Sequence, residues 1–458
     1  MGRFSRRTFL RQTAAASCAA FALQGLVNRA ALFAARGASA LGPSADVGYG
    51  PLFPTPSNNT GETLLAIPEG FQYNVIGKAG SIMSDGRPTP AAHDGMAAFD
   101  VGGLIHLVRN HENSGGGASS VAYGSLPYDA KATGGTTTLV VDPATRLLVQ
   151  DFASLSGTVR NCAGGPTPWG SWLSNEETVV SEQTPGSFFT RTHGYIFEVP
   201  AAAPGETAPL PLKGMGRFSH EAAAVDPATS IVYETEDASP SGFYRYVPYE
   251  PGKLAGGGQL QMLAVAGRPQ YDTRRGQQPG QQLPAIWVDL WDPDPILENG
   301  ALPTVNQGII QGGAIFARLE GCWYGDGSIF FVSTSGGNAD QGQIWQYTPT
   351  GSTEGVLTLV FESPNAAVLN NPDNITVSPR GGLVLCEDGS GDEFLHGLTL
   401  QGQIFQFVKN IVPGNEGSEF AGATFSPDGQ TLFFNLQGPG LTFALWPKPG
   451  YAWEDGAL

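Results

Sequence analysis

The chain has 458 residues, of which 63 are Gly and 35 are Pro, and its formal net charge at pH 7 is −17. So many Gly and Pro residues exclude a coiled coil and favour short strands, while the 10% of aromatic residues supply a core that a disordered chain lacks. The excess of acidic residues argues against nucleic acid as a partner, because a phosphate backbone needs a basic surface. We therefore expect a mostly β protein without nucleic-acid binding.

The first 40 residues have the features of a twin-arginine export signal. The segment SRRTFL at residues 5–10 carries the arginine pair, an apolar stretch follows at residues 14–27, and small residues at 38–40 suit cleavage. No later stretch stays apolar over the ~18 residues that a membrane helix needs, so we expect no stable membrane span. We predict export through the twin-arginine machinery and a periplasmic or extracellular location. An ordinary secretory signal is the alternative, and it implies export as well.

One unit of sequence recurs six times along the chain. Each copy has a small or apolar run, a turn rich in Asp, Pro or Gly, and a second apolar run, which is typical of a β-hairpin. The copies begin at Asp94, Cys162, Glu221, Glu320, Asp373 and Ala421. Further strand-like runs follow several copies, for example at residues 243–247 and 343–347. We predict an all-β, six-bladed β-propeller over roughly residues 60–450, with a long β-sandwich or a tandem of small β-domains as the alternative.

Polar residues stand at both ends of most copies. The first residue is acidic or Cys in five of the six, and polar residues return after the second run. These later residues are Asn110, Glu112, Glu176, Glu177, Glu236, Asp237, Ser335, Glu387 and Asp388. A hairpin brings its start and its end to the same edge of a sheet, and six such edges meet at the mouth of a propeller channel. We expect a ring of carboxylates there, with the thiol of Cys162 among them.

Such a ring requires cations, because neighbouring carboxylates repel and raise one another's pKa values. Oxygen ligands suit Ca²⁺, Mg²⁺, Mn²⁺ or Fe³⁺, and a single thiolate indicates a transition metal at one position. Zinc catalysis is disfavoured, because the sequence has no HExxH motif and no Cys pair at metal-binding spacing. The sequence therefore predicts a mixed metal cluster in the central channel. The alternative is that the acidic residues only hold the blade turns together.

Several segments resemble the PhoX-type alkaline phosphatase family, and the likeness extends over most of the chain. The most specific segments are NCAGG at residues 161–165 and SNEE at 174–177, and RNHE at 109–112, GRFSHE at 216–221 and NPDN at 371–374 agree with them. The resemblance implies a compact relative with a six-bladed propeller and with ferric iron and calcium in the axial channel. It also implies hydrolysis of small phosphate monoesters at alkaline pH outside the cytoplasm.

The resemblance implies roles for individual residues as well. Cys162 would be the thiolate ligand of iron, and Arg318 would grip the phosphoryl group of the substrate. The other implied ligands, to iron or calcium, are Glu176, Glu177, Glu221, Glu320, Asp373, Glu387 and Asp388. Once residues 1–40 are removed, we expect residues 41–458 to form a single phosphatase-like propeller domain that is a monomer.

Two other functions fit the same pattern. A calcium-dependent propeller lactonase would need a divalent cation in the channel, but neither a thiolate ligand nor Arg318. A non-catalytic propeller would bind a partner through its face and use calcium for structural support. Iron content separates both from the phosphatase.

Overall fold

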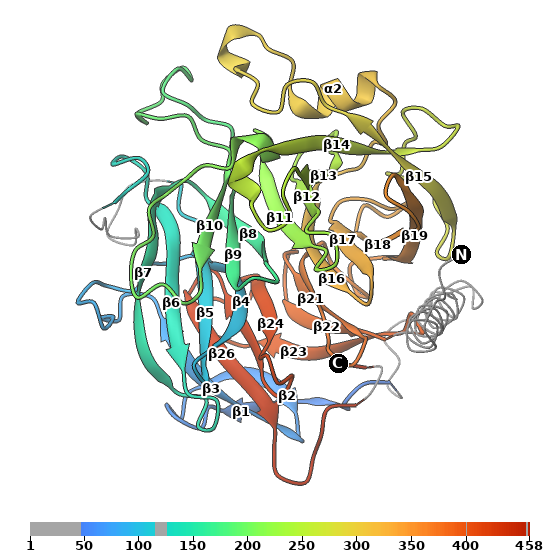
Figure 1. Ribbon diagram of the computed structural model, residues 1–458. Helices are drawn as coiled ribbons and strands as arrows, with labels where there is room; N and C mark the ends of the chain where they lie inside the picture. Colours follow the sequence, from blue (N-terminus) through green and yellow to red (C-terminus); the bar gives the residue numbers. More distant parts are fainter. Residues whose placement is uncertain (1–46, 115–125, 400, 455–456) are drawn as a thin grey trace, which may run out of the picture.

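The structure is a computed structural model that describes residues 47–114, 126–399, 401–454 and 457–458. Residues 1–40, the predicted export signal, lie outside these ranges. The strands surround a central axis in an all-β, propeller-like arrangement (Figure 1). The helical elements of the described residues are short: η1 (Lys213–Met215), η2 (Leu254–Gly256), η3 (Leu297–Asn299) and α2 (Thr304–Ile310). None of these helices is both long and apolar enough to cross a membrane.

Strands that follow one another along the chain pair antiparallel, and each of the six predicted hairpins is present. Each hairpin belongs to a meander, a run of consecutive antiparallel strands. The first meander contains β4 (His93–Val101), β5 (Leu104–His111), β6 (Gly134–Val141) and β7 (Leu148–Thr158), and the second contains β8 (Asn161–Pro166), β9 (Ser171–Glu176) and β10 (Ile196–Pro200). The third contains β11 (His220–Val225), β12 (Val232–Glu236), β13 (Phe243–Pro248) and β14 (Gly258–Val265). The fourth contains β16 (Leu319–Gly325), β17 (Ser328–Ser333), β18 (Gln343–Pro349) and β19 (Glu354–Glu362). The fifth contains β20 (Pro372–Val377), β21 (Leu383–Glu387), β22 (Phe394–Leu398) and β23 (Ile404–Asn410). The last contains β24 (Phe420–Phe425), β25 (Leu432–Leu436), β26 (Leu441–Pro447) and, from the start of the chain, β3 (Phe71–Lys78).

The described strands form five hydrogen-bonded sheets rather than six separate blades. The reason is β15 (Gln282–Asp289), which pairs with both β14 and β19 and joins two meanders into one nine-stranded sheet. In the same way β1 (Leu52–Pro56) and β2 (Thr63–Pro68) extend the sheet of β23. Added strands of this kind cover sheet edges that would otherwise expose unpaired backbone groups. The all-β, propeller-like part of the prediction is confirmed. The predicted number of blades is not, because the described strands form five sheets and not six.

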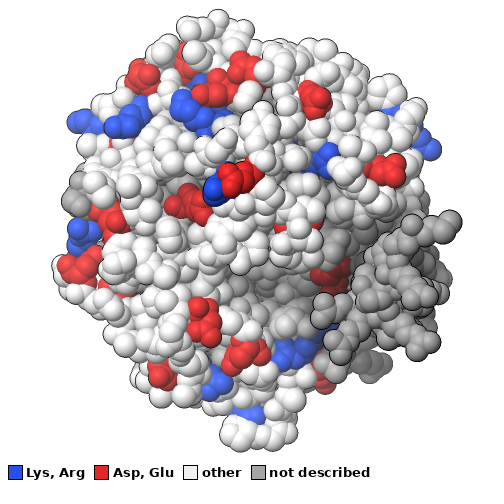
Figure 2. All heavy atoms as spheres, in the orientation of Figure 1, with Lys and Arg blue, Asp and Glu red and all other residues white. Residues whose placement is uncertain are grey.

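The innermost strands close into a ring. They contact one another in the order β4, β8, β11, β16, β20 and β24, and β24 contacts β4 again. Apolar side chains fill the space between neighbouring meanders: the rings of Phe243 and Phe331, from β13 and β17, stack with centroids 4.1 Å apart. On the face drawn in Figure 2, the described Lys and Arg side chains lie among Asp and Glu rather than in one continuous basic patch. The closed ring holds the channel ends of all six hairpins at fixed positions.

Candidate metal centre

Each of the six hairpins has a β-bulge in its inner strand, close to the axis. In β4 the pairing register shifts between His93 and Met96, and the other five inner strands shift near their starts as well. A bulge breaks the alternation of a strand and re-aims a side chain. Five of the bulges begin at Asp94, Cys162, Glu221, Glu320 and Asp373, and the sixth lies between Ala421 and Thr424. In five of the six copies, the residue that opens the repeat in the sequence is therefore a bulged residue of the fold, whereas in the sixth copy Ala421 pairs with Asn435 and the bulge follows it.

One backbone hydrogen bond recurs in all six hairpins and closes the end that faces the channel. In the first hairpin, the N–H of Glu112 donates to the carbonyl of Ala92, and the six bonds measure 2.9 to 3.2 Å. The other donors are Glu177, Asp237, Thr334, Asp388 and Gln437, and their acceptors are Arg160, Ser219, Arg318, Asn371 and Glu419. Three positions of each hairpin thus lie at its channel end: the residue that opens the copy, the one two positions before it, and the one after the second strand.

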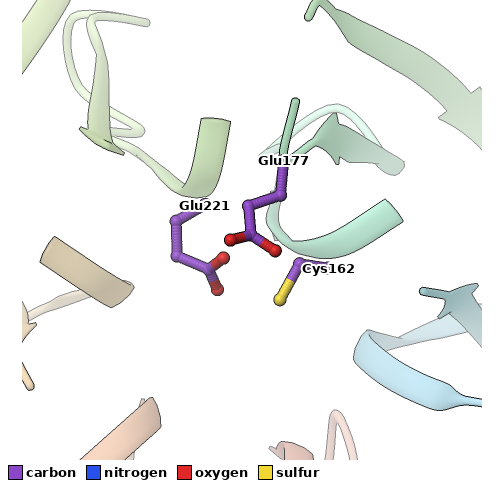
Figure 3. A group of neighbouring side chains, drawn as sticks. All are labelled: Cys162, Glu177 and Glu221. Carbon is purple, nitrogen blue, oxygen red and sulfur yellow. The ribbon is translucent and has the colours of Figure 1, made fainter. Parts of the chain in front are cut away.

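Cys162, Glu177 and Glu221 form the first group of candidate metal ligands. All three are buried, and their ligand atoms lie within 4.8 Å of one another. Figure 3 shows the three side chains pointing toward one another in the channel. The Sγ atom of Cys162 also lies 3.8 Å from Oδ2 of Asp94. A thiol and two carboxylates at this spacing suit a transition metal.

Two further groups consist of carboxylates alone. Glu221, Glu320 and Asp373 form one of them, so Glu221 belongs to two groups, and the same 4.8 Å limit holds. Asp94, Glu112 and Glu419 form the other. Groups of oxygen ligands suit hard cations such as Ca²⁺.

The donor set fits cations because no described residue compensates the charge of Glu221. Both of its carboxylate oxygens are buried, and neither has a hydrogen-bond partner among the residues that the structure describes. An ionised carboxylate in such a place costs several kcal/mol unless an opposite charge is present. A cation between the two groups that share Glu221 would supply that charge.

Burial and mutual repulsion raise the pKa values of these acidic groups. Burial, followed by the charges of Glu320 and Asp373, raises the pKa of Glu221 well above its usual value. Burial raises the pKa of Asp373 to about 7 and that of Glu177 to about 10. Burial and nearby carboxylates also raise the pKa of the Cys162 thiol. Protons therefore neutralise the group when no cation does, and cation binding must displace them.

Two arginines occupy equivalent positions, each two residues before a bulged residue. Nε and Nη2 of Arg318 donate to the two carboxylate oxygens of Asp237 at 2.9 and 3.0 Å. Nε of Arg160 donates to Glu112 at 2.9 Å, and its Nη2 lies 3.2 Å from a carboxylate oxygen of Glu177. Each arginine side chain keeps 45% of its surface exposed. Arg318, the predicted phosphate clamp, is thus accessible at the edge of the cluster.

The structure does not bring Glu176, a predicted ligand, into any of the three groups. Its Oε1 accepts a hydrogen bond from the N–H of Val159 at 2.9 Å and lies 2.6 Å from Nδ1 of His193. Its Oε2 accepts one from the N–H of Gly194 at 2.8 Å. Neighbouring residues at the end of a strand point in opposite directions, so Glu177 faces the channel and Glu176 faces away.

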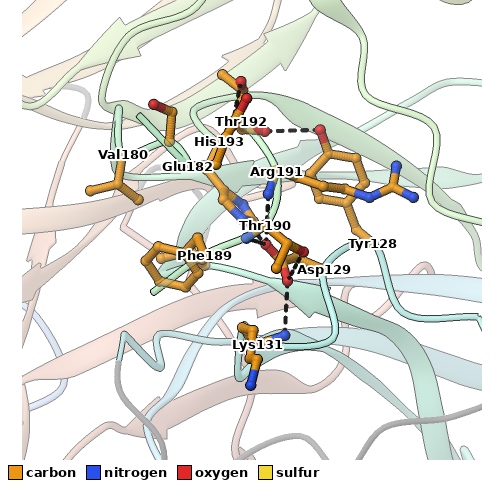
Figure 4. Close-up of polar contacts among 12 residues, drawn as sticks. Tyr128, Asp129, Lys131, Val180, Glu182, Phe189, Thr190, Arg191, Thr192 and His193 are labelled. Atoms are coloured by element: carbon orange, nitrogen blue, oxygen red, sulfur yellow. Dashed lines mark hydrogen bonds and ion pairs between the residues drawn. The ribbon is translucent and has the colours of Figure 1, made fainter. Parts of the chain in front are cut away.

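Buried polar contacts support Glu176 through His193. Figure 4 shows the surroundings of His193 and Asp129. Nε2 of His193 lies 3.5 Å from Oδ2 of Asp129. The carboxylate of Asp129 in turn accepts backbone hydrogen bonds from Lys131 at 2.8 Å and Thr190 at 2.6 Å. The side chains of His193 and Asp129 are completely buried. These contacts fix the loop that leads to His193, and with it the end of β9 that carries Glu177.

Glu387 and Asp388 repeat this division of roles. Oε1 of Glu387 accepts a hydrogen bond from the N–H of Asn370 at 2.7 Å and lies 2.9 Å from Nε2 of His396. Glu387 thus lies outside the three groups. Burial raises the pKa of the Glu419 carboxyl, and Asp388 lies close enough to raise it further, which places Asp388 beside the cluster, although it belongs to none of the three groups.

Three candidate ligands were not among the predicted ones: Asp94, Glu112 and Glu419. Asp94 opens the first copy of the repeat and Glu112 follows its second run, so the repeat pattern contained both. Glu419 lies two residues before the sixth copy, at the position that corresponds to Arg160 and Arg318. An alignment of the copies extended by two residues toward the N-terminus would have included Glu419.

These features define a propeller-like protein whose channel holds a thiol, clustered carboxylates and two arginines, and is suited to several cations. The family described as Alkaline phosphatase PhoX matches residues 47–440, and the chain belongs to this family. The resemblance seen in the motifs is thereby confirmed. Family membership supports a hydrolase of the alkaline phosphatase class that acts on phosphate esters.

A solved structure with a similar fold agrees with the propeller-like architecture. Pseudomonas fluorescens PhoX in complex with vanadate, a transition state analogue, has a TM-score of 0.65 at 17% identity, covering 88% of this chain and 98% of that chain. A gluconolactonase from Xanthomonas campestris has a TM-score of 0.45 at 10% identity, covering 88% and 99%. At these identities the likeness concerns the fold alone. No curated protein sequence matches the chain.

Proposed function

We propose that the protein is an exported, metal-dependent phosphatase that hydrolyses phosphate monoesters at alkaline pH with an iron–calcium cluster and an arginine clamp. The observation that carries this proposal is Glu221, a buried carboxylate without a hydrogen-bond partner in the described part of the chain, at the junction of two ligand groups. In this proposal the two meanders that β15 joins count as separate blades, and the cluster would stand at the centre of a six-bladed propeller.

The chemistry of the donors assigns the metals. Iron would be held by Cys162, Glu177 and Glu221, because that group has the thiol. Calcium would be held by the two carboxylate groups, which offer oxygen only. When bound, these ions supply Lewis-acid charge neutralisation and lower the pKa of water. Glu221 would contribute to both kinds of site, because it belongs to the group with the thiol and to one of the carboxylate groups.

Arg318 binds the phosphoryl group in this proposal. A chain with a net charge of −17 repels phosphate, so a local positive group must attract it. The planar guanidinium matches two phosphate oxygens, and the hydrogen bonds with Asp237 raise its pKa further, so it stays charged at alkaline pH. Nη2 also donates to Glu320 at 2.9 Å, whereas Nη1 has no hydrogen bond to any described residue. Asp237 orients the arginine and leaves Nη1 free for the substrate.

Export belongs to the same proposal. The predicted twin-arginine signal at residues 1–40 would carry the folded protein to the periplasm or the medium, with the metals loaded before export. The folded, closed ring of inner strands around the buried ligands supports loading during folding rather than afterwards. The protein is expected to act as a monomer.

The test replaces one of two buried cysteines. Cys162→Ala removes the thiol of the proposed iron site, and Cys322→Ala is the matched control, because Cys322 is buried in the apolar core. We expect Cys162→Ala to lose its iron and to lower kcat/KM for p-nitrophenyl phosphate by ~100-fold, and the control to keep both properties. A folded Cys162→Ala variant with normal iron content and activity would contradict the proposal.

A further inference from the structure

A polar pocket opens beside Arg318 on the rim of the channel, and its volume is about 560 Å³. Three of its lining residues adjoin the backbone around Arg318. Ala317 precedes Arg318, Ser239 follows the residue whose carbonyl accepts the Arg318 N–H at 2.8 Å, and Ser335 follows the residue that donates to the Arg318 carbonyl at 2.9 Å. The other lining residues are Asp272, Arg274, Arg275 and Asp340. The backbone of Arg318 therefore adjoins this pocket.

The outer wall of the pocket is preformed. Asp272 makes a β-bridge with Ile315, and the N–H of Thr273 donates to the Ile315 carbonyl at 2.9 Å. The carbonyl of Arg274 accepts a hydrogen bond from the N–H of Gly337 at 2.8 Å. These backbone contacts tie the segment that carries both arginines to the segments before Arg318 and after β17. A pocket with fixed walls loses little conformational entropy on binding.

The charges that line the pocket cancel in pairs. Nη2 of Arg275 donates to Oδ1 of Asp340 at 2.7 Å, and Nε of Arg274 donates to Oδ1 of Asp272 at 2.9 Å. Because each of these side chains is 40 to 65% exposed, such pairs contribute only ~0–1 kcal/mol and a ligand can compete for their atoms. The pocket has no net charge to attract a second phosphate.

The pocket also offers hydroxyl groups. No described residue forms a hydrogen bond with the side-chain hydroxyl of Ser239 or Ser335. Arginine donates, aspartate accepts, and serine does both. None of the residues that line the pocket is aromatic. This combination matches a ligand with several hydroxyls, each of which donates and accepts, better than a flat aromatic ring.

We propose that the pocket binds the alcohol part of the substrate and that this part is polyhydroxylated, as in a sugar phosphate or glycerol phosphate. The inference rests on the proposed phosphatase function and specifies its substrate class. With the phosphoryl group at Arg318, the alcohol oxygen leaves toward Ser239 and Ser335, and the remaining hydroxyls face the Arg275–Asp340 pair. Arg275, which is exposed and belongs to none of the three groups of candidate metal ligands, determines specificity.

The test compares glucose 6-phosphate with p-nitrophenyl phosphate on the full-length, metal-loaded protein. Arg275→Gln should raise KM for glucose 6-phosphate five- to tenfold more than KM for p-nitrophenyl phosphate, and Ser335→Ala should shift the ratio in the same direction. Arg268→Gln is the matched control: Arg268 lies in the same part of the chain, but it does not line the pocket. Equal effects of Arg275→Gln on both substrates, or no effect on either, would overturn the inference.

Failure of the proposed function gives a different result. If the wild-type protein hydrolysed neither ester, the phosphatase proposal would fail, and calorimetry would still measure binding of glucose 6-phosphate. Binding that Arg275→Gln weakens at least fivefold, and that Arg268→Gln leaves unchanged, would support a polyol pocket. Absence of binding, or equal affinities in all three proteins, would refute it.

Discussion

At the scale of single residues, two arginines with the same place in their hairpins have different partners. Arg318 contacts Asp237 and Glu320, whereas Arg160 connects Glu112 with Glu177. Arg160 thus links two ligand groups, while Arg318 lies next to an open pocket. The sequence motifs predicted a functional role only for Arg318. Arg160 has the same place in its repeat, but its role depends on its neighbours in the fold, which the repeat does not specify.

Arg318→Gln should reduce kcat/KM for phosphate monoesters by ~100-fold or more, because it removes the charge and the fork that hold the phosphoryl group. Arg318→Lys should recover only part of the activity, because an ammonium group lacks the two-pronged geometry. The matched control is Arg87→Gln, since Arg87 forms only a 3.9 Å ion pair with Asp85. Steady-state kinetics of a folded Arg318→Gln variant that matched the wild type would eliminate the clamp.

The buried pair of His193 and Glu176 predicts a pH dependence of stability. Although burial lowers it, the charges of Glu176 and Asp129 raise the pKa of His193 above its ordinary value of 6.5. A histidine with a raised pKa stabilises the fold fully below pH 6.5, and this contribution is lost as the pH rises through the raised pKa. The wild type should therefore exceed His193→Gln in free energy of unfolding by more at pH 6 than at pH 9. Urea unfolding of both metal-loaded proteins measures the difference, and a difference that stays constant or grows with pH would be the wrong sign.

Neighbouring residues also mark the limit of the sequence prediction. Glu176 and Glu177, like Glu387 and Asp388, are consecutive polar residues at a strand end, and the pattern assigned all four to metals. In the structure, the first of each pair binds backbone N–H groups and the second faces the channel side. Which one faces the channel depends on the exact register of the strand, and composition does not reveal a shift of one residue.

At the scale of elements, the six hairpins were predictable because each contains its own turn chemistry and two apolar runs. The bulges were not, because they depend on how an inner strand packs against the next one around the ring. Gly321 illustrates this packing: a Cβ atom at this position would lie 2.6 Å from the backbone N of Ile375 in the adjacent inner strand. Glycine at this position lets β16 and β20 approach, which brings Glu320 close to Asp373.

Gly321→Ala should therefore destabilise the protein by about 1–3 kcal/mol and weaken cation binding, since the added methyl group meets backbone that cannot move aside. Gly205→Ala is the control, because a Cβ atom added at Gly205 would have no described atom within 4 Å, and this variant should change stability by less than ~0.5 kcal/mol. Urea unfolding and metal content are the measurements. Equal stability of the two variants would show that the close approach of the strands is unimportant.

At the scale of the whole molecule, the repeat in the sequence predicted the propeller-like ring and a channel lined by carboxylates. It did not predict that β15 would bridge two meanders, because residues 282–289 lie in an insertion between two copies of the repeat. The lining of the channel follows from symmetry: six copies place six bulged residues around one axis, and five of them are acidic or Cys. Asp272, Arg274 and Arg275, which line the pocket beside Arg318, also lie in that insertion, which the repeat does not describe.

The central claim is that this ring holds iron and calcium for phosphate ester hydrolysis. The most direct measurement is metal analysis of protein exported through its own signal, with p-nitrophenyl phosphate hydrolysis assayed on the same sample before and after calcium chelation. We predict iron together with calcium, and phosphatase activity that chelation abolishes. Calcium without iron and without phosphatase activity would contradict the account and would favour a calcium-dependent lactonase or a binding propeller.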